Sequence, residues 1–158
     1  MLLNRREMCS LFPAAFLPIV DGVAASATQD VDPDQAGVTQ EAALPSATFP
    51  FDDLPVRVSN SAQIRHILKG KLATGESLEA HETTLPPGAA PHPPHHHVHS
   101  EMWLIREGTV ELTINGASHV LGPGSLGFVR SNEEHGIKNV GTAPATYFVV
   151  AVGPGAGA

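Results

Sequence analysis

Residues 91–108 read PHPPHHHVHSEMWLIREG, and this stretch decides how the rest of the chain is interpreted. Side chains on an extended strand alternate between two faces, so His95 and His97 point the same way, and Glu101 joins them if the chain stays extended. Two imidazoles and a carboxylate can bind a metal ion and leave positions open for substrate, water or oxygen. The alternative is a proline-broken surface loop whose histidines are solvated.

The sequence around this stretch predicts an all-β protein. Its 158 residues suit a single core, and its 15 glycines and 14 prolines indicate many turns. Residues 110–114 alternate apolar and polar before Asn115-Gly116, a dipeptide that type I′ hairpin turns prefer. Residues 61–69 could instead form a short helix. The short strand-like runs are 64–68, 78–85, 102–105, 110–114, 118–121, 126–129, 136–140 and 145–152. This spacing predicts a barrel or jelly roll.

The N-terminal segment has the pattern of an export signal. Arg5-Arg6 precede an apolar stretch at 11–20 and the small residues Ala25-Ser26-Ala27, so residues 1–27 resemble a twin-arginine signal peptide. The mature protein would then be periplasmic or secreted by a bacterium. The apolar stretch is shorter than the roughly 20 residues that cross a bilayer, so no membrane anchor is expected.

The remaining domain boundaries follow from composition. Residues 28–48 lack apolar periodicity and basic residues, and they are expected to form a disordered linker. The first apolar cluster begins at Phe49, so the folded domain is expected at 49–152, with residues 153–158 as a flexible tail.

Charge and cysteine content exclude two kinds of site. The formal net charge is -7 and the basic residues form no cluster, so nucleic acid is not an expected partner. The single cysteine, Cys9, lies in the segment expected to be removed. A metal in the mature chain must therefore be held by nitrogen and oxygen.

Two groups of residues resemble the signature motifs of the cupin superfamily. The first consists of Gly88, His95-His96-His97, Glu101 and Gly108, and the second of Gly124, His135 and Asn139. Arg130 and Asn132 stand where the family has proline and glycine. Asparagine tolerates the positive φ that glycine would supply, so the fold prediction is unaffected.

The resemblance implies a double-stranded β-helix, the cupin jelly-roll barrel, and commonly a homodimer. It also implies one divalent transition metal, Fe, Mn, Zn, Ni or Cu, held by His95, His97, Glu101 and His135. His96 has the opposite strand parity and is interpreted as pointing outward.

Each residue expected near the metal has two interpretations, one as part of a substrate pocket and one as a structural or surface residue. A substrate pocket would include His99, Trp103, Phe128 and Arg130. The alternatives are an exposed loop for His99 and for His92, core packing for Trp103 and Phe128, and a solvent-facing Arg130 beside Glu133 and Glu134.

The catalytic residues are unknown at this level. The residues considered as a general base are Glu79, His81, Glu82 and Tyr147, whose side-chain directions the sequence leaves open; His66, His81 and His119 are otherwise interpreted as structural or surface residues. The leading hypothesis is an exported metalloenzyme that acts on a small organic molecule, by dioxygenase or by lyase or isomerase chemistry. The alternative is a module that binds a metal or small ligand without turnover.

Overall fold

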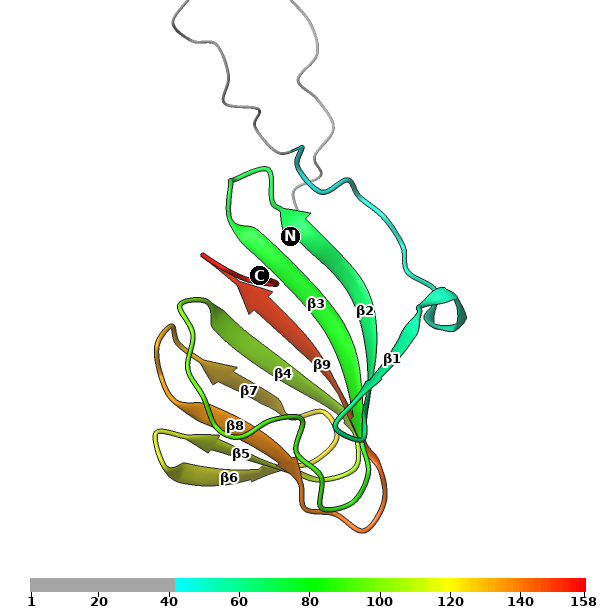
Figure 1. Cartoon of the computed structure of the whole chain (residues 1–158), viewed down its shortest axis with the longest axis vertical. Coiled ribbons are helices and arrows are strands. Elements are labelled where there is room, and N and C mark those ends of the chain that lie inside the picture. Colours follow the sequence, from blue (N-terminus) through cyan, green and yellow to red (C-terminus); the bar gives the residue numbers. More distant parts are fainter. Residues whose placement is uncertain (1–41) are drawn as a thin grey trace, which may run out of the picture. The chain divides into compact units, whose positions relative to one another are not determined.

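The computed structural model describes residues 42–158, in which nine strands follow a short 3-10 turn, η2 (Phe51–Asp53) (Figure 1). The expected signal peptide and linker residues up to 41 lie outside the described residues. Within the described part, no helix has the length and apolarity needed to cross a membrane. The strands are β1 (Val56–Ser59), β2 (Ala62–Lys71), β3 (Ser77–Leu85), β4 (Ser100–Glu107), β5 (Val110–Ile114), β6 (Ala117–Leu121), β7 (Leu126–Val129), β8 (His135–Asn139) and β9 (Ala145–Val152).

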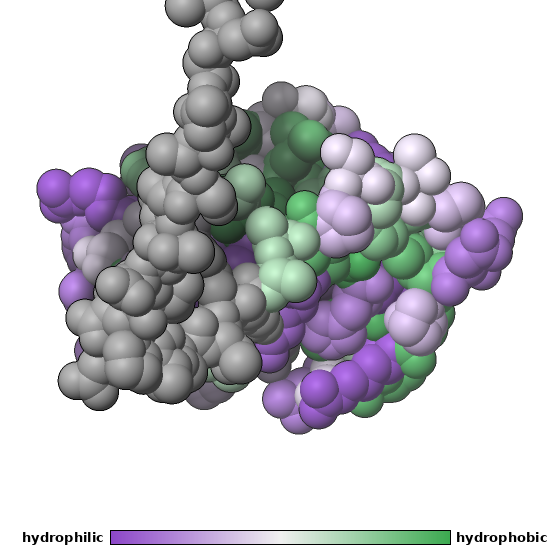
Figure 2. Space-filling view, turned by 90° about the horizontal axis from the view of Figure 1, so that it is seen from above, coloured by the Kyte–Doolittle hydropathy of each residue, from purple (hydrophilic) through white to green (hydrophobic). Residues whose placement is uncertain are grey.

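The strands form two antiparallel sheets whose apolar faces share one core. One sheet has the order β1-β2-β3-β9-β4-β7 and the other the order β6-β5-β8. Trp103 and Tyr147 from the larger sheet are buried in the same cluster as Leu112 and Ile137 from the smaller sheet. Figure 2 shows the molecule from above, with hydrophobic residues visible between hydrophilic ones on this face. The all-β jelly-roll prediction is confirmed.

Local patterns explain which strands could be predicted. The hairpin is confirmed, because Asn115 and Gly116 have φ of 48° and 81° and Ile114 pairs directly with Ala117. The helical alternative for residues 61–69 is wrong, since they lie in β2 and pair with β3. Strand β1 was not predicted, because its valines are exposed and show no apolar alternation toward the core.

Turn residues of the two motifs shape the backbone around the barrel. Gly108 has φ of 78°, and a Cβ there would lie 2.6 Å from the Cα of Ala145, so a side chain would clash with backbone. Asn132 has φ of 63°, which confirms that it takes the positive φ expected at this position. The amide of Asn132 donates to the carbonyl of His97 at 2.8 Å and so ties the β7–β8 loop to the histidine loop.

Asn139 joins three chain segments from inside the protein. It is fully buried, its Nδ2 donates to the carbonyls of Leu85 and Ala143 at 2.9 Å, and its Oδ1 accepts from the amide of Gly141 at 2.9 Å. Buried amides of this kind are stable only when their hydrogen bonds are made. Asn139 is therefore structural, and it fixes the end of β3 that leads into the histidine loop.

Both ends of the described chain contact the barrel. Leu44, from the segment expected to be linker, donates its amide to the carbonyl of Lys71 at 2.7 Å. In the segment expected to be a flexible tail, Ala156 is buried and its amide donates to the carbonyl of Gly153 at 3.1 Å. These parts of the chain are packed in the structure.

Candidate metal centre

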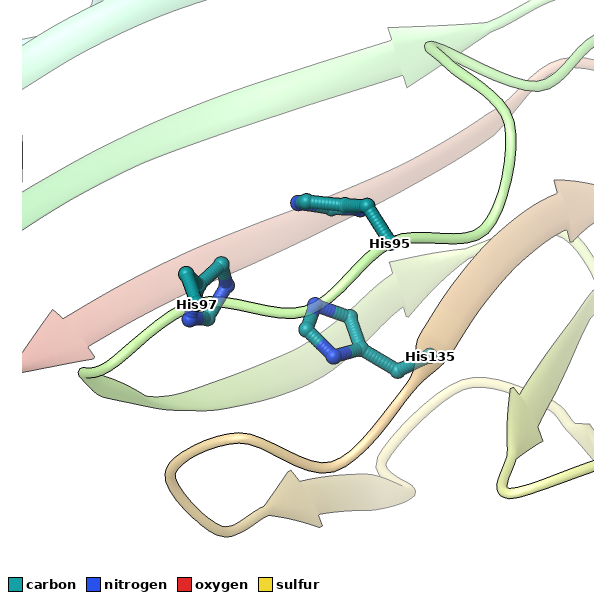
Figure 3. A group of neighbouring side chains, drawn as sticks. All are labelled: His95, His97 and His135. Atoms are coloured by element: carbon teal, nitrogen blue, oxygen red, sulfur yellow. The ribbon is translucent and has the colours of Figure 1, made fainter.

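The histidine loop and strand β8 are joined by backbone hydrogen bonds at the point where their imidazoles meet. The amide of His95 donates to the carbonyl of His135 at 2.9 Å, and the amide of His135 donates to the carbonyl of His95 at 2.8 Å. Figure 3 shows His95 and His97 on the loop before β4 and His135 at the start of β8, with the three rings close together. The ring of His135 lies 4.7 Å from each of the other two, between centroids.

Glu101 completes the group at the start of β4. The Nε2 atoms of His97 and His135 lie 3.3 and 3.5 Å from the two carboxylate oxygens of Glu101. One ring nitrogen from each of His95, His97 and His135 lies within 4.8 Å of the others. Two donors bound to one ion at bond lengths near 2.1 Å are about 3.0 to 3.5 Å apart, so the distances to Glu101 suit a shared ion.

Backbone carbonyls orient two of the imidazoles toward this group. The Nδ1 of His97 donates to the carbonyl of His99 at 2.9 Å, and that of His135 donates to the carbonyl of Glu133 at 2.9 Å. Each Nε2 is then an acceptor, yet both are buried without a hydrogen-bond partner among the described residues, as is the Nδ1 of His95. Ligating histidines have this arrangement, in which the second ring nitrogen donates to a carbonyl. The buried lone pairs fit a bound cation.

The electrostatics favour the ligating protonation states of His95 and Glu101, whereas the pKa of His135, which burial would lower, is raised by the adjacent Glu101 and by its bond to the carbonyl of Glu133. Burial, together with neighbouring His92, His135 and His97, lowers the pKa of His95 to about 4. Burial alone would raise the pKa of Glu101, but the adjacent imidazoles of His135, His97 and His99 lower it to about 2. A neutral imidazole and an ionised carboxylate at neutral pH are the forms that bind metal.

The other loop histidines divide into two groups. His96 is exposed, as expected for an outward position. His92 is also exposed, but it lines the inner cavity and its ring centroid lies 4.2 Å from that of His95. His99 is half-buried, stacks on His97 with ring centroids 3.5 Å apart, and places its Nε2 3.4 Å from Glu101. His97, His99 and Glu101 also lie within mutual reach of one ion. His99 thus belongs to the site environment, which favours the pocket interpretation over the exposed-loop alternative.

Two of the expected pocket residues are elsewhere. Phe128 is 51% exposed, because inward positions in β7 belong to Gly127 and Val129, and this alternation turns Phe128 to the outer face. Arg130 is 75% exposed and pairs with Glu133 at 2.5 Å, so it does not line the cavity. Trp103 is buried and lies beside His135 with ring centroids 5.3 Å apart, as the pocket interpretation required.

An apolar cavity of about 210 Å³ extends from the histidine group into the barrel. Its walls include Trp103, Ile137, Tyr147 and Val149, with Glu101 and His135 at its polar end. Burial raises the pKa of the Tyr147 hydroxyl, and the charge of Glu101 adds to this, so Tyr147 stays protonated. The site therefore offers a mostly apolar chamber beside the candidate ligands.

A second polar group lies on the same sheet as Glu101, two strands away, because Glu79 and Glu101 are both register partners of Ala151 in β9. His81 lines the cavity, and its Nδ1 bonds to the buried carboxylate of Glu79 at 2.9 and 3.0 Å. His66 lies 3.6 Å from the same carboxylate. Glu82, also considered as a base, is buried outside the cavity lining and pairs with Arg106 at 2.7 Å. Among the residues considered as a general base, His81 lines the cavity and is hydrogen-bonded to the buried carboxylate of Glu79. These two residues are therefore the best candidates.

Comparisons with known proteins agree with this geometry. The family model described as the cupin domain matches residues 81–151. A search of curated proteins gives no match.

Solved structures show the same fold. An RmlC-like cupin from Shewanella frigidimarina is 20% identical with a TM-score of 0.58, covering 70% of this chain and 94% of its own. A predicted oxalate decarboxylase from Thermotoga maritima is 20% identical with a TM-score of 0.58, covering 68% and 99%. A sugar phosphate isomerase from Silicibacter pomeroyi is 18% identical with a TM-score of 0.56, covering 66% and 74%. With both motifs present and the jelly roll formed, the chain belongs to the cupin superfamily.

Proposed function

We propose that this chain is a metal-dependent enzyme that binds one divalent transition metal through His95, His97, Glu101 and His135 and acts on a small organic molecule. The observation that carries the proposal is the set of buried imidazole nitrogens that lack partners among the described residues and surround one carboxylate. A buried polar atom without a partner costs free energy, and a cation at this position would remove that cost.

The donor set limits the metal to ions that accept imidazole and carboxylate together. Fe, Mn, Zn, Ni and Cu all do so. A divalent ion with open coordination positions supplies Lewis-acid stabilisation of developing negative charge on a substrate oxygen. The chain supplies the apolar walls that exclude water, including Trp103 and Val149.

The Glu79–His81 pair favours an enzyme over a module that only binds. A histidine held through Nδ1 by a buried carboxylate keeps Nε2 free to exchange a proton with a ligand in the cavity. Two structural neighbours are a predicted oxalate decarboxylase and a sugar phosphate isomerase, and decarboxylation and isomerisation involve no net oxidation of the substrate by oxygen. We therefore propose lyase or isomerase chemistry in preference to dioxygenase chemistry.

Elemental analysis of protein from its native host, followed by assays of the metal-loaded protein, tests this proposal. Turnover of a small organic acid or carbonyl compound with no oxygen consumption is the expected result. Oxygen uptake that depends on substrate and iron would support a dioxygenase instead. Saturable ligand binding without turnover under every candidate metal would support the binding module.

We also propose that the protein is exported, which the twin-arginine pattern of Arg5-Arg6 supports. Mass spectrometry of protein from the native host should give a mature N-terminus near Thr28. A cytosolic protein that retains Met1 would contradict this.

A homodimer is a further proposal. It is supported by Leu104, Leu126 and Phe128, which are 47%, 59% and 51% exposed on the outer face of β4 and β7. Light scattering should give twice the chain mass, and Phe128→Glu should yield monomer. A monomeric wild-type protein at micromolar concentration would contradict the proposal.

A further inference from the structure

The cavity mouth has two chemically different walls. The mouth encloses about 510 Å³, and His95, His97, His99 and Glu101 line one side of it. Strands β1, β2 and β3, which lie across β9 from Glu101 in the same sheet, supply the other side. The nitrogen-bearing side chains on this side, here called the cationic wall, are Arg57, His66, Lys69 and His81.

A β-bulge aims two of these side chains inward. His66 pairs with His81, but the next pair is Leu68 with Ala80, so Ile67 is an extra residue in β2. Without the bulge, alternation from an inward His66 would turn Lys69 outward. With it, Lys69 pairs with Glu79 and lines the mouth. Bulges often re-aim side chains next to functional sites.

Arg57 reaches the same wall by ordinary strand pairing. It is the register partner of Ile64, and paired residues in an antiparallel sheet share a face. Ile64 lines the inner cavity, so Arg57 also points inward.

Arg57 and Lys69 form no ion pair with any described residue, unlike several other basic side chains. Arg106 pairs with Glu82, Arg130 pairs with Glu133, and Lys71 donates to Ser77. Two unpaired cations thus line one cavity in a chain whose formal net charge is -7. Glu79 and Glu101 also line the mouth, so an anion would bind there through direct contacts with Arg57 and Lys69 and not through a net positive charge.

Glu79 is the acidic residue on this wall, and it does not cancel both cations. Its carboxylate is shared by His81 at 2.9 Å and His66 at 3.6 Å. These contacts leave the head groups of Arg57 and Lys69 for a ligand.

We propose that Arg57 and Lys69 bind the second anionic group of a small organic diacid whose first carboxylate lies at the metal ligands. The inference rests on the proposed function for the position of the first carboxylate, and it adds the substrate class. Arginine and lysine recognise carboxylates through charge-assisted hydrogen bonds, and the wide mouth admits a short diacid across its span.

Calorimetry with a matched series of acids tests the proposal. Zinc-loaded protein, with its metal content first verified, is titrated with malonate, succinate and glutarate, and with propionate and butyrate as monoacids. At least one diacid should bind about ten-fold or more tightly than the monoacids, and Arg57→Gln and Lys69→Gln should each weaken that diacid about ten-fold. The monoacids should be little affected by either change.

Lys138→Gln is the matched control, because Lys138 is an exposed lysine of β8 that does not line the mouth. It should leave every affinity unchanged. Equal binding of diacids and monoacids, or diacid binding insensitive to Arg57→Gln and Lys69→Gln, would overturn the proposal.

Titration of metal-free protein with succinate distinguishes a failure of the proposed metal centre from a failure of the proposed anion site. If the chain takes up no zinc, the proposed function fails, while the anion site still predicts weak succinate binding that Arg57→Gln and Lys69→Gln abolish. Zinc uptake without any preference for diacids would leave the metal site standing and refute the anion site.

Discussion

His95 and His135 each donate a backbone amide to the carbonyl of the other, at 2.9 and 2.8 Å, although they belong to a loop and to a strand far apart in the sequence. This reciprocal pair fixes the spacing of the two imidazoles before any metal binds. The candidate site is therefore prepared by the backbone, and metal affinity should depend on individual ring nitrogens.

Replacement of His99 tests whether a residue beside the proposed ligands supports metal binding. Its ring stacks on His97 and its Nε2 lies 3.4 Å from Glu101, so it supports two proposed ligands. His99→Ala should retain about one metal per chain but lower zinc affinity roughly 10 to 100-fold, the usual effect of losing a supporting partner. Competition with a chromophoric chelator measures this. The exposed His96→Ala is the control, and equal affinities in the two variants would show that His99 has no supporting role.

Stability of the metal-free protein should fall with acid in a defined range. The pKa of His95 is lowered from 6.5 to about 4 by burial and neighbouring histidines, so between these values the unfolded chain binds more protons than the folded chain. The free energy of unfolding therefore decreases as pH falls from 6.5 to 4. Glu101, with its pKa near 2, extends the same trend below pH 4.5. The raised pKa of His135 acts in the opposite sense, and burial limits that rise.

Urea unfolding at pH 7, 5.5 and 4 checks the pH prediction. His95→Gln removes the titrating group and should reduce the loss of stability between pH 6.5 and 4. An identical pH dependence in wild type and His95→Gln would assign the acid sensitivity to other groups.

Asn139 should contribute to stability more than to metal binding. Asn139→Ala leaves the carbonyls of Leu85 and Ala143 without this donor and should lower the free energy of unfolding by about 2 to 4 kcal/mol. Asn132→Gly, at a positive φ that glycine adopts freely, should change it by less than about 1 kcal/mol. Chemical denaturation compares the two, and similar small losses would contradict the role given to Asn139.

Alanine substitutions at two glycines distinguish the cost of backbone strain from the cost of a steric clash. Gly108 and Gly124 have φ of 78° and 81°, but only at Gly108 would a Cβ meet backbone, at 2.6 Å from Ala145 Cα. Gly124→Ala should cost about 1 to 2 kcal/mol for its φ alone, and Gly108→Ala should cost more. Equal losses in thermal or urea unfolding would mean that the β9 backbone moves freely to relieve the clash.

Sequence patterns with a fixed period were sufficient for the barrel, whereas the grouping of the histidines came from the resemblance to the two cupin motifs. The Asn115-Gly116 turn and the alternation of β5 depend only on local backbone geometry, so the hairpin was predictable. The joining of His135 to His95 followed from the resemblance of the two motifs, and the structure places them together.

The cationic wall and the positions of Phe128 and Arg130 were not predictable, for reasons seen in β2 and β7. The bulge at Ile67 shifts the alternation of β2, so His66 and Lys69 both face inward, which strict period-2 alternation forbids. The sequence predicts Phe128 at the substrate pocket or in the core, whereas the strand parity of β7 turns it outward. Arg130 finds a partner in Glu133, so local pairing overrides its position near the site.

The most direct test of the central claim is the metal content of His135→Ala beside that of His96→Ala, after removal of loosely bound metal with chelator and reloading with zinc. His135 reaches the loop only through the fold, and His96 is exposed within the histidine tract itself. Elemental analysis should find about one zinc per chain in His96→Ala and a large loss in His135→Ala, with both variants showing native β-sheet circular dichroism. Full zinc retention in folded His135→Ala would mean that the tract binds metal as an isolated loop, and it would contradict the proposed metal centre.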